Sequence, residues 1–150
     1  MRQCRYKKPV PRTRQHVAPE LLFQALGDRT RLRLLNLMGD QELCVCYFVE
    51  VLRQPQPKIS RHLAYLRRAG VVTSRREGKW IHYRIEQATN PQAQELLRNV
   101  LAWLALDKAM QADRARLVRA CCAPSKCSLI REAPQPAFVS GKPEDRKRSR

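Results

Sequence analysis

Apolar residues recur at helical spacing through the first half of the chain, and helix-terminating residues divide this pattern into segments. Pro19 suits the first turn of a helix that runs to Leu26, where Gly27 provides a natural stop. Asp28 is a good N-cap for a second helix, which carries leucines at helical spacing and ends at Gly39. The pattern therefore predicts two short helices in close succession.

Two further helices are expected before the pattern changes. The third covers residues 44–53 and ends before Pro55, and the fourth runs from Pro57 to Gly70. Proline is tolerated at the first helical position, because its missing amide hydrogen would have no partner there. The third and fourth helices are therefore separated by a tight turn, an arrangement that indicates a helix-turn-helix.

The segment VVTSRREGKWIHYRI after the fourth helix changes to a period of two. Its apolar side chains Ile81, Tyr83 and Ile85 alternate with Trp80, His82 and Arg84. This alternation, interrupted at Glu77-Gly78, predicts a β-hairpin whose turn lies at those two residues. We expect His82 to be a surface residue of the hairpin.

A long last helix is expected from the Asn90-Pro91 cap to about residue 119. Its apolar stripe consists of Leu97, Val100, Leu101 and Leu104, with Trp103 nearby. The stripe is long for a domain of this size, so we predict that it forms a two-fold interface together with the first helix. Such a homodimer would place two recognition helices about one turn of DNA apart, on a palindromic site.

The order of these elements defines the expected fold class. Four helices, a hairpin and a last helix predict a mainly α chain with a small β-hairpin wing (α+β), which is the winged helix-turn-helix. The domain is expected to cover residues 17–122. Residues 1–16 contain six basic side chains and no acid, which predicts a flexible basic arm. Residues 123–150 contain several prolines and a basic end, which predicts a mostly disordered tail.

The charge balance indicates the class of partner. Thirty lysines and arginines against thirteen acidic residues give a net charge of +17, which favours a nucleic acid. No apolar run approaches the ~18 residues of a membrane span, and the first residues, MRQCRYKKPVPRTR, lack the apolar stretch of a secretory signal. We therefore expect no membrane partner and a cytoplasmic location.

The fourth helix and the hairpin carry the predicted nucleic-acid interface. At about 100° per residue, Ile59, Leu63 and Leu66 share the inner side of the helix, and basic and hydroxyl side chains occupy the rest. A solvated basic face is the simpler interpretation of one helix, but here the charges of helix and hairpin coincide. The predicted DNA contacts are Gln56, Lys58, Ser60, Arg61, His62, Tyr65, Arg68, Arg75, Arg76 and Lys79. His62 lies at the core edge, where packing is an equal alternative.

Two cysteines in the stretch ELCVCYF are candidate metal ligands. Cys44 and Cys46 fall about 100° to either side of the apolar stripe expected on the third helix, which favours ligands over core packing. Residues i and i+2 on a regular helix point about 200° apart, so the pair could bind one ion only at a helix end or where the helix unwinds. A disulfide between them would be strained.

A second group of thiols lies in CCAPSKC, where the last helix should end. Cys121, Cys122 and Cys127 could bind one thiophilic ion, form a redox-sensitive disulfide, or be exposed tail cysteines. Cys4 is separate from both groups, in the basic arm. No acid–base constellation or phosphate-binding glycine loop accompanies these thiols, so we do not expect an enzyme.

Four stretches together resemble the ArsR/SmtB family of metal-responsive repressors, closest to its arsenic-responsive branch. They are ALGDRTRLRLL, ELCVC, QPKISRHLAYLRRAGVV and EGKWIHYRI, and the resemblance covers about residues 18–86. It implies a winged-helix homodimer that binds the operator of its own resistance operon and leaves when arsenite or antimonite binds cysteine thiolates. The match places Lys58, Ser60, Arg61 and His62 in the DNA-reading helix, and Cys44 with Cys46 on the Cys-Val-Cys inducer pair.

Two departures from this family leave the third ligand open. Tyr47 stands where members with this pair commonly have aspartate, and Val49 stands where some have a third cysteine. The resemblance also keeps alternatives open, because some arsenic repressors bind near the C-terminal end of the last helix and cadmium/lead-responsive relatives recruit N-terminal thiols. The zinc site of other relatives needs histidines on the last helix, whereas here the histidines are His16, His62 and His82.

Overall fold

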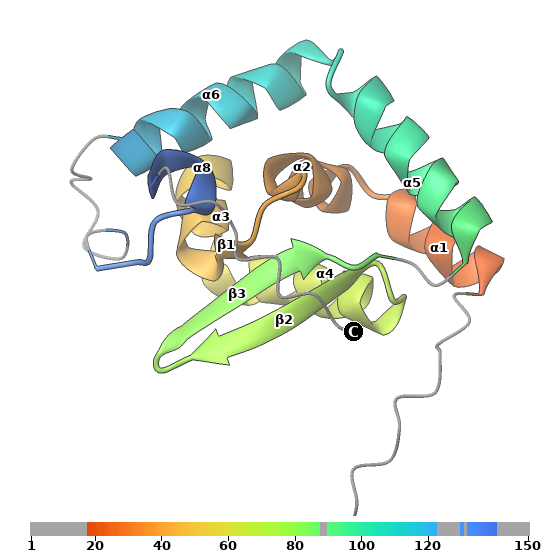
Figure 1. Ribbon diagram of the computed structural model, residues 1–150, viewed down its shortest axis with the longest axis horizontal. Coiled ribbons are helices and arrows are strands. Elements are labelled where there is room, and N and C mark those ends of the chain that lie inside the picture. Colours follow the sequence, from red (N-terminus) through yellow and green to blue (C-terminus); the bar gives the residue numbers. More distant parts are fainter. Residues whose placement is uncertain (1–17, 88–89, 123–129, 131, 141–150) are drawn as a thin grey trace, which may run out of the picture.

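The computed structural model describes residues 18–87, 90–122, 130 and 132–140 of the chain (Figure 1). The predicted arm 1–16, Cys4 and Cys127 lie outside these residues. The elements in chain order are α1 (Pro19–Leu26), α2 (Arg29–Met38), β1 (Leu43–Cys44), α3 (Val45–Leu52), α4 (Gln56–Arg68), β2 (Val72–Glu77), β3 (Trp80–Ile85), α5 (Pro91–Leu104), α6 (Lys108–Cys122) and α8 (Ala137–Ser140). The fold is a winged helix-turn-helix, as the element order predicted.

The predicted helix starts are confirmed by their capping contacts. The carboxylate of Asp28 accepts a hydrogen bond from the backbone N–H of Arg31 at 2.9 Å, and the side chain of Asn90 accepts one from Gln92 at 2.9 Å. Both contacts satisfy N–H groups that have no partner within the first turn of a helix. Gly70 follows α4 with a φ of 74°, a conformation that favours glycine.

The three strands form one antiparallel sheet in the order β1-β3-β2. The predicted hairpin is confirmed, and it pairs Val72 with Ile85 at its open end and Glu77 with Trp80 next to its turn. The turn itself lies at Gly78-Lys79, one residue later than predicted. The short strand β1 was not predicted. It adds to the other edge of β3 and places Cys44 opposite His82. Two residues are too few for a periodic signal, so only the tertiary contact with β3 reveals this strand.

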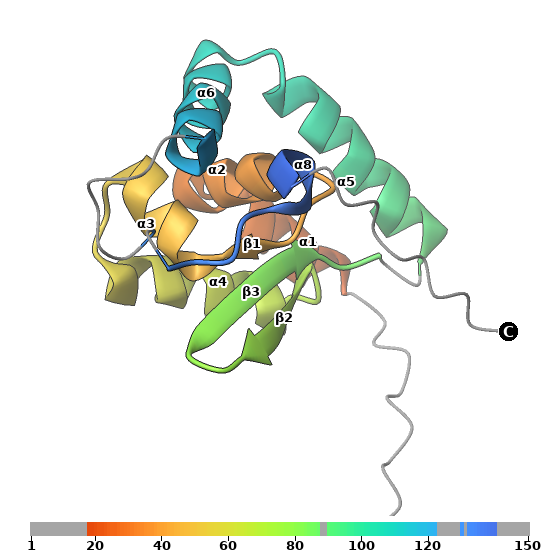
Figure 2. The same cartoon turned by 60° about the vertical axis from the view of Figure 1, so that its left-hand side comes forward.

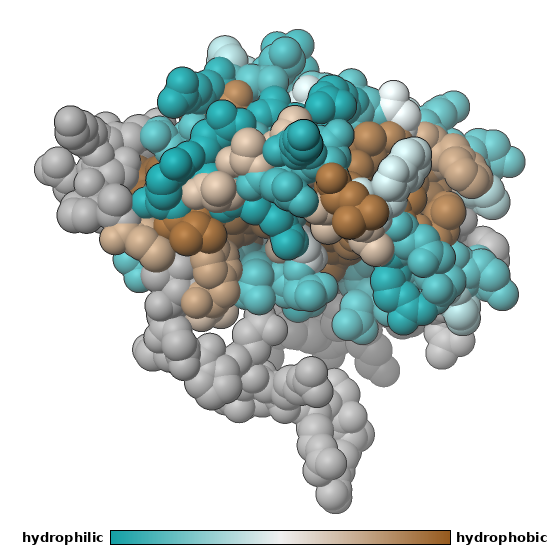
Figure 3. Space-filling model, turned by 90° about the horizontal axis from the view of Figure 1, so that it is seen from above, coloured by the Kyte–Doolittle hydropathy of each residue, from teal (hydrophilic) through white to brown (hydrophobic). Residues whose placement is uncertain are grey.

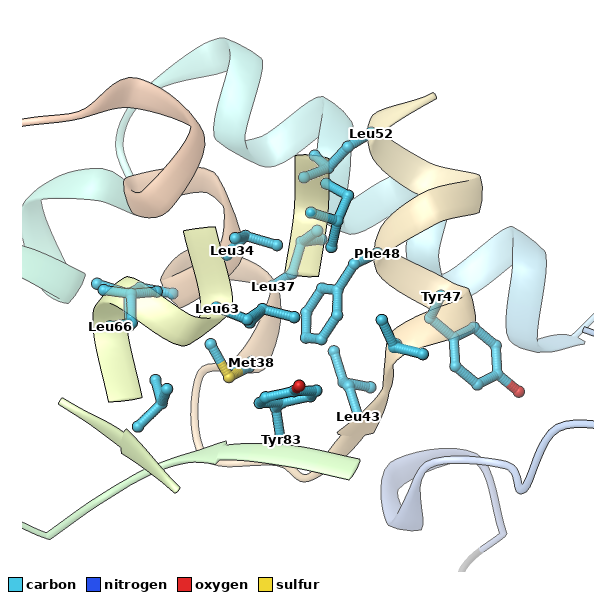
Figure 4. Close-up of a cluster of buried hydrophobic side chains, with 14 of the residues drawn as sticks. Leu34, Leu37, Met38, Leu43, Tyr47, Phe48, Leu52, Leu63, Leu66 and Tyr83 are labelled. Atoms are coloured by element: carbon cyan, nitrogen blue, oxygen red, sulfur yellow. The ribbon is translucent and has the colours of Figure 1, made fainter. Parts of the chain in front are cut away.

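The core lies between α2, α3, α4 and the sheet. Figure 4 shows Phe48, Leu63 and Tyr83 directed toward a common centre from α3, α4 and β3. The rings of Phe48 and Tyr83 meet edge to face, with their centroids 6.5 Å apart. Leu34 and Leu66 are completely buried in the same cluster. The core therefore holds the helix-turn-helix and the wing as one unit.

The predicted long last helix is two helices, α5 and α6, which meet at an angle in Figure 1. The carboxylate of Asp107 accepts hydrogen bonds from the N–H groups of Ala109 at 2.8 Å and Met110 at 3.1 Å. Asp107 thereby begins a new helix in the middle of the expected one. The break turns α6 back across α2 and α3, which a single straight helix could not reach.

A buried carboxylate attaches α6 to α2. Asp113 is completely buried, and Arg33 donates to it through Nε at 2.6 Å and Nη2 at 2.8 Å. Arg116 donates a third bond at 2.6 Å. Burial alone would raise the pKa of Asp113, but the hydrogen bonds and charges of both arginines outweigh it and hold the pKa below the usual range. Asn36 adds a contact to the Met110 carbonyl at 3.0 Å.

Part of the segment expected to be a disordered tail is folded onto the domain. Ile130 and Ala133 are buried in the core cluster, and the side chain of Gln135 donates to the carbonyl of Cys121 at 3.5 Å. Figure 2 shows the stretch that leads to α8 running beside β1. For these residues the prediction is wrong, because α3 and α6 present an apolar surface that the tail composition does not reveal. No helix in the described ranges is long and apolar enough to cross a membrane.

Candidate nucleic-acid interface and thiol pair

The outer side of α4 presents most of the residues predicted to contact DNA. Ile59, Leu63 and Leu66 are completely buried on its inner side. The remaining positions are exposed or half-buried, and among them are Gln56, Lys58, Ser60, Arg61, His62, Tyr65 and Arg68. Arginine, lysine and hydroxyl groups in this setting can donate hydrogen bonds to phosphates and base edges.

A hollow of about 670 Å³ lies where α4 begins, beside the start of α2. Its lining consists of Arg31, Pro55, Pro57, Lys58, Arg61, His62 and Tyr65. Three permanent cations therefore surround one open cavity at a helix N-terminus, where the backbone N–H groups also favour negative charge. Chemically, the hollow suits an anion such as a phosphate group.

Tyr65 joins α4 to the end of α1. The guanidinium groups of Arg31 and Arg68 lie 4.4 Å and 5.0 Å from the centre of its ring, within the range of cation–π contacts. Its hydroxyl donates to the side chain of Gln24 at 3.2 Å, and Arg31 donates to the carbonyls of Gln24 and Ala25, each at 2.7 Å. Tyr65 thus has a positioning role beside its predicted place on the outer side of α4.

Arg75 on the wing is already paired with two carboxylates. Its guanidinium contacts Glu42 at 2.6 Å and Glu77 at 2.6 Å. The hydrogen bond to Glu42, followed by that to Glu77, raises the pKa of Arg75, and Arg75 in turn lowers the pKa of Glu77. Both acidic partners reduce the positive charge that Arg75 can offer to DNA.

Arg76 and Lys79 at the tip of the wing also have contacts within the chain. Arg76 donates to the carbonyl of Gly78 at 3.1 Å, and Lys79 lies 2.5 Å from Glu132 of the C-terminal segment. Lys79 also lies over the ring of Trp80, 5.0 Å from its centre. The three basic residues predicted for the wing are therefore grouped near its turn, but each carries a neighbour that sequence periodicity does not reveal.

The prediction that His82 is a surface residue is wrong. Its side chain is 5% exposed and lies between two carboxylates, with Nδ1 3.7 Å from Glu42 and Nε2 3.8 Å from Glu77. Strand β1, which was not predicted, pairs with β3 here and places Cys44 opposite His82.

The sulfur atoms of Cys44 and Cys46 lie 3.6 Å apart, and the thiol of Cys44 donates to the sulfur of Cys46. Two thiolates on one tetrahedral zinc ion, each about 2.3 Å from the metal, would lie about 3.8 Å apart. Cys44 is the N-cap of α3, with φ −69° and ψ 145°, so it is extended while Cys46 is helical. The pair therefore lies at a helix end, and the unwinding that a regular helix would require is unnecessary.

The prediction that both cysteines flank the buried side of α3 is also wrong. Cys44 is 1% and Cys46 is 8% exposed, and both belong to the core cluster. The stripe argument fails because α3 is buried on nearly every side, including Tyr47 and Val51. Core burial and a pairing suited to one thiophilic ion thus coexist at the same two residues.

Tyr47 and Cys121 are neighbours of this pair. Tyr47 is 1% exposed, and in Figure 4 its ring is directed away from Phe48 and the core centre. Burial raises the pKa of Tyr47 to about 12, and the charges that Cys121, Cys44 and Cys46 would carry as thiolates add to that rise. The pKa of the Tyr47 hydroxyl thus responds to the charge of three cysteines, one each from β1, α3 and α6.

The three cysteines predicted as one group, Cys121, Cys122 and Cys127, do not share one environment. Cys121 is 4% exposed, and burial, followed by the charge of Cys122, raises its pKa to about 11. Cys122 is exposed, and Cys127 lies outside the described residues. Within the described ranges, no three side chains of histidine, cysteine, aspartate or glutamate are arranged to hold a metal ion.

Residues 28–74 match the family described as "Bacterial regulatory protein, arsR family". The arsenic resistance transcriptional regulator ArsR1 of Pseudomonas putida is 37% identical over 110 residues, which cover 70% of this chain and 86% of that protein. The chain belongs to the ArsR family. The arsenical resistance operon repressor of Escherichia coli is 41% identical over 105 residues, which cover 69% of this chain and 88% of the repressor.

A solved structure supports the same fold for this ArsR-family protein. HlyU from Vibrio cholerae aligns with a TM-score of 0.50 and 27% identity, over 56% of this chain and 88% of HlyU. The relatives are transcriptional regulators and not enzymes, so the chain is an ArsR-family repressor, a DNA-binding regulator of transcription.

The positions of two residues near the site of this ArsR-family repressor could not be predicted from any periodic pattern in the sequence. Arg31 belongs to α2, and only the packing of α2 against α4 brings it into the hollow. Cys121 is separated from Cys46 by 75 positions, and only the break between α5 and α6 returns it to α3. No local sequence signal could place either residue.

Proposed function

We propose that this ArsR-family repressor is a homodimer that binds a palindromic operator and leaves it when arsenite or antimonite binds Cys44 and Cys46. It would act in the cytoplasm, on an arsenical-resistance operon. The observation that supports this proposal best is the 3.6 Å separation of two buried sulfur atoms at the start of α3. The names of two relatives, an arsenic resistance regulator and an arsenical resistance repressor, support the same inducer.

The DNA contacts would be centred on the start and outer side of α4. Lys58, Arg61 and the predicted hydrogen-bond donor Ser60 lie beside the hollow or on the exposed face, where backbone phosphates and base edges can reach them. Arg31 joins this set as a phosphate contact. Arg75 would contribute less than the other predicted contacts, because Glu42 and Glu77 already neutralise it. The other residues predicted to contact DNA remain part of the proposal.

The two cysteines of the pair lie in elements that connect directly to the wing and to α4. Cys44 lies in β1, which pairs with wing strand β3, and Cys46 lies in α3, which packs against α4 and leads into it through the turn at Arg53. An ion that binds both sulfur atoms would therefore act on the junction of wing and recognition helix. An inducer that binds the altered junction better than the DNA-bound one shifts the population away from DNA.

Operator release should depend on the α3 pair. We expect Cys44→Ser with Cys46→Ser to need at least about a hundredfold more arsenite for half-release, since the chelate is lost. The variant with Cys122 and Cys127 both changed to serine should still respond. The measurement is fluorescence anisotropy of labelled operator during arsenite titration, under a non-thiol reductant.

The other inducers have distinct outcomes in the same assay. Release by cadmium and not by arsenite would overturn the metalloid proposal in favour of a cadmium/lead sensor that uses Cys4. Release by oxidant alone would favour a disulfide switch at the C-terminal thiols. Retained response in the pair variant and lost response in the variant with Cys122 and Cys127 changed to serine would move the site to Cys121, Cys122 and Cys127.

The dimer would form through apolar side chains that α1 and α5 leave exposed. Phe23 is 61%, Trp103 is 75% and Leu106 is 76% exposed. Figure 3 shows hydrophobic residues exposed among polar ones on this face of the molecule. Apolar surface of this kind is typical of a protein–protein interface, and a closed two-fold contact is the commonest arrangement of identical chains.

A charge on this surface should separate the protomers. We expect Phe23→Asp with Trp103→Asp to reduce the mass in solution from twice 17.5 kDa to that of one chain, because burying unpaired carboxylates is costly. Multi-angle light scattering measures the change. Phe138→Asp on α8, which is 43% exposed in the native protein, is the matched control and should leave the mass unchanged. A monomeric wild type would contradict the proposal.

A further inference from the structure

We propose that Cys121 of α6 supplies the third thiol to the Cys44–Cys46 pair, so that one trivalent arsenic is bound by sulfur atoms from β1, α3 and α6. This inference rests on the proposed function, because it completes the same inducer site. It differs from a site made of Cys121, Cys122 and Cys127, since it takes only the first of those thiols.

The pair is incomplete for an ion that takes three sulfur ligands. Val49 occupies the position one turn after Cys46, so α3 itself offers no further thiol. The ligand must come from an element that packs against α3. Of the two cysteines that end α6, Cys121 is 4% exposed and belongs to the same core cluster as the pair, whereas Cys122 is exposed.

Cys121 lies on a helix that packs against the helix of the pair. Helix α6 contacts α3, and Cys121 is buried in the same core cluster as Cys44 and Cys46. The charges that these three cysteines would carry as thiolates all raise the pKa of Tyr47. The C-terminal segment adds to this enclosure, because Gln135 donates to the Cys121 carbonyl at 3.5 Å. Cys122, its neighbour in sequence, has none of this burial, which makes it a matched control.

Binding requires Cys121 to move. Within the described ranges no three ligating side chains surround one point, so the end of α6 has to bring Cys121 closer to the pair. Tyr47 follows Cys46 in sequence, is 1% exposed, and is the side chain whose pKa the charges of all three thiols raise.

The exchange balances without a redox partner. Arsenous acid, As(OH)₃, exchanges each of its three hydroxyl groups for one cysteine sulfur, and each thiol proton leaves with a hydroxyl group as water. Three S–H and three As–O bonds break, three As–S bonds and three water molecules form, and arsenic remains trivalent. The product is neutral, so burying it costs no charge desolvation, whereas a divalent cation with three thiolates would leave a buried negative charge.

Two arsenic probes separate a third ligand from a merely structural cysteine. Arsenite takes three thiols, whereas phenylarsine oxide has two exchangeable positions and needs only the pair. We expect Cys121→Ser to need about a hundredfold more arsenite for half-release of labelled operator, because one arm of the chelate is lost. Its response to phenylarsine oxide should equal that of the wild type. Cys122→Ser should match the wild type with both probes.

Thiol protection identifies the ligands directly. The full-length protein is treated with arsenite and then N-ethylmaleimide, and peptide mass spectrometry locates the unmodified cysteines; we expect Cys44, Cys46 and Cys121. Protection of the pair alone, with an unchanged Cys121→Ser response, would overturn this inference and leave the proposed function intact. Protection of Cys121 together with Cys122 and Cys127 would overturn both. Loss of both probe responses in Cys121→Ser would show a structural role and overturn this inference.

Discussion

Replacing Asp113 with alanine is expected to lower the free energy of unfolding by about 3 kcal/mol, at the lower end of what breaking a buried ion pair costs. Asp113 is completely buried and accepts three hydrogen bonds, two from Arg33 and one from Arg116. Its removal leaves the guanidinium of Arg33, whose side chain is only 22% exposed, without its anion. The attachment of α6 to α2 would lose its main polar contact.

The same carboxylate should set an acid limit to stability. Because the pKa of Asp113 is lower in the folded than in the unfolded protein, its contribution is complete above the unfolded value, about 3.9. The contribution is lost as the pH falls through the lower folded pKa. We therefore expect the wild type to lose stability below about pH 4, and Asp113→Asn to lose less over that interval.

Urea unfolding followed by circular dichroism measures these changes between pH 2.5 and 7. Glu95→Ala is the matched control, because Glu95 pairs with Arg98 on the surface of α5, where both side chains are at least half exposed. Exposed pairs contribute at most about 1 kcal/mol, so this variant should unfold almost like the wild type. If Asp113→Ala and Glu95→Ala lowered the free energy of unfolding equally, Asp113 would not hold α6 to α2 as we infer.

The operator affinity of the proposed homodimer is expected to fall by at least about a thousandfold when salt rises from 50 to 200 mM. That decrease corresponds to about six neutralised phosphates, or about three for each protomer. Arg31, Lys58 and Arg61 around the hollow at the start of α4 supply this number of cations. Fluorescence anisotropy with labelled operator DNA over a series of salt concentrations gives the slope. A nearly flat dependence would contradict a phosphate-binding role for this face.

Two variants distinguish a cation available to DNA from one already paired. Lys58 lies exposed beside the hollow, and Lys58→Ala should reduce the salt slope by about one for each phosphate that is no longer neutralised. Arg75→Ala should change the slope much less, because Glu42 and Glu77 each lie 2.6 Å from its guanidinium in the free protein. Equal effects would mean that Arg75 exchanges its carboxylates for phosphates on DNA.

Local chemistry explains why the helix-turn-helix could be predicted. Asp28 and Asn90 cap helices because their side chains accept hydrogen bonds within the next three residues. Tyr83 faces the core because alternation in a strand assigns it to the side of Ile81 and Ile85. Each of these outcomes depends on neighbours along the chain, so the residue pattern contains the necessary information.

The thiol site depended on contacts that no pattern contains. The burial of Cys46 follows from packing on nearly every side of α3, and His82 lies between Glu42 and Glu77, which are distant from each other in sequence. Even the helical stripe was misleading, because it presumes a helix with one solvent face. The prediction of where Cys44 points failed for a different reason. It assumed a helical residue, whereas Cys44 is the extended N-cap of α3.

The sequence by itself determined the winged helix-turn-helix, the basic outer side of α4 and the presence of a Cys-Val-Cys pair, because capping, periodicity and charge act over a few residues. Tertiary structure alone decided that the pair is buried with its sulfur atoms 3.6 Å apart, that Arg75 is neutralised, and that α6 returns Cys121 to α3. The physical reason is that each of these contacts joins residues from different elements. For Cys121 the Asp107 cap decides, because it ends one helix, begins another and thereby redirects the chain toward α3.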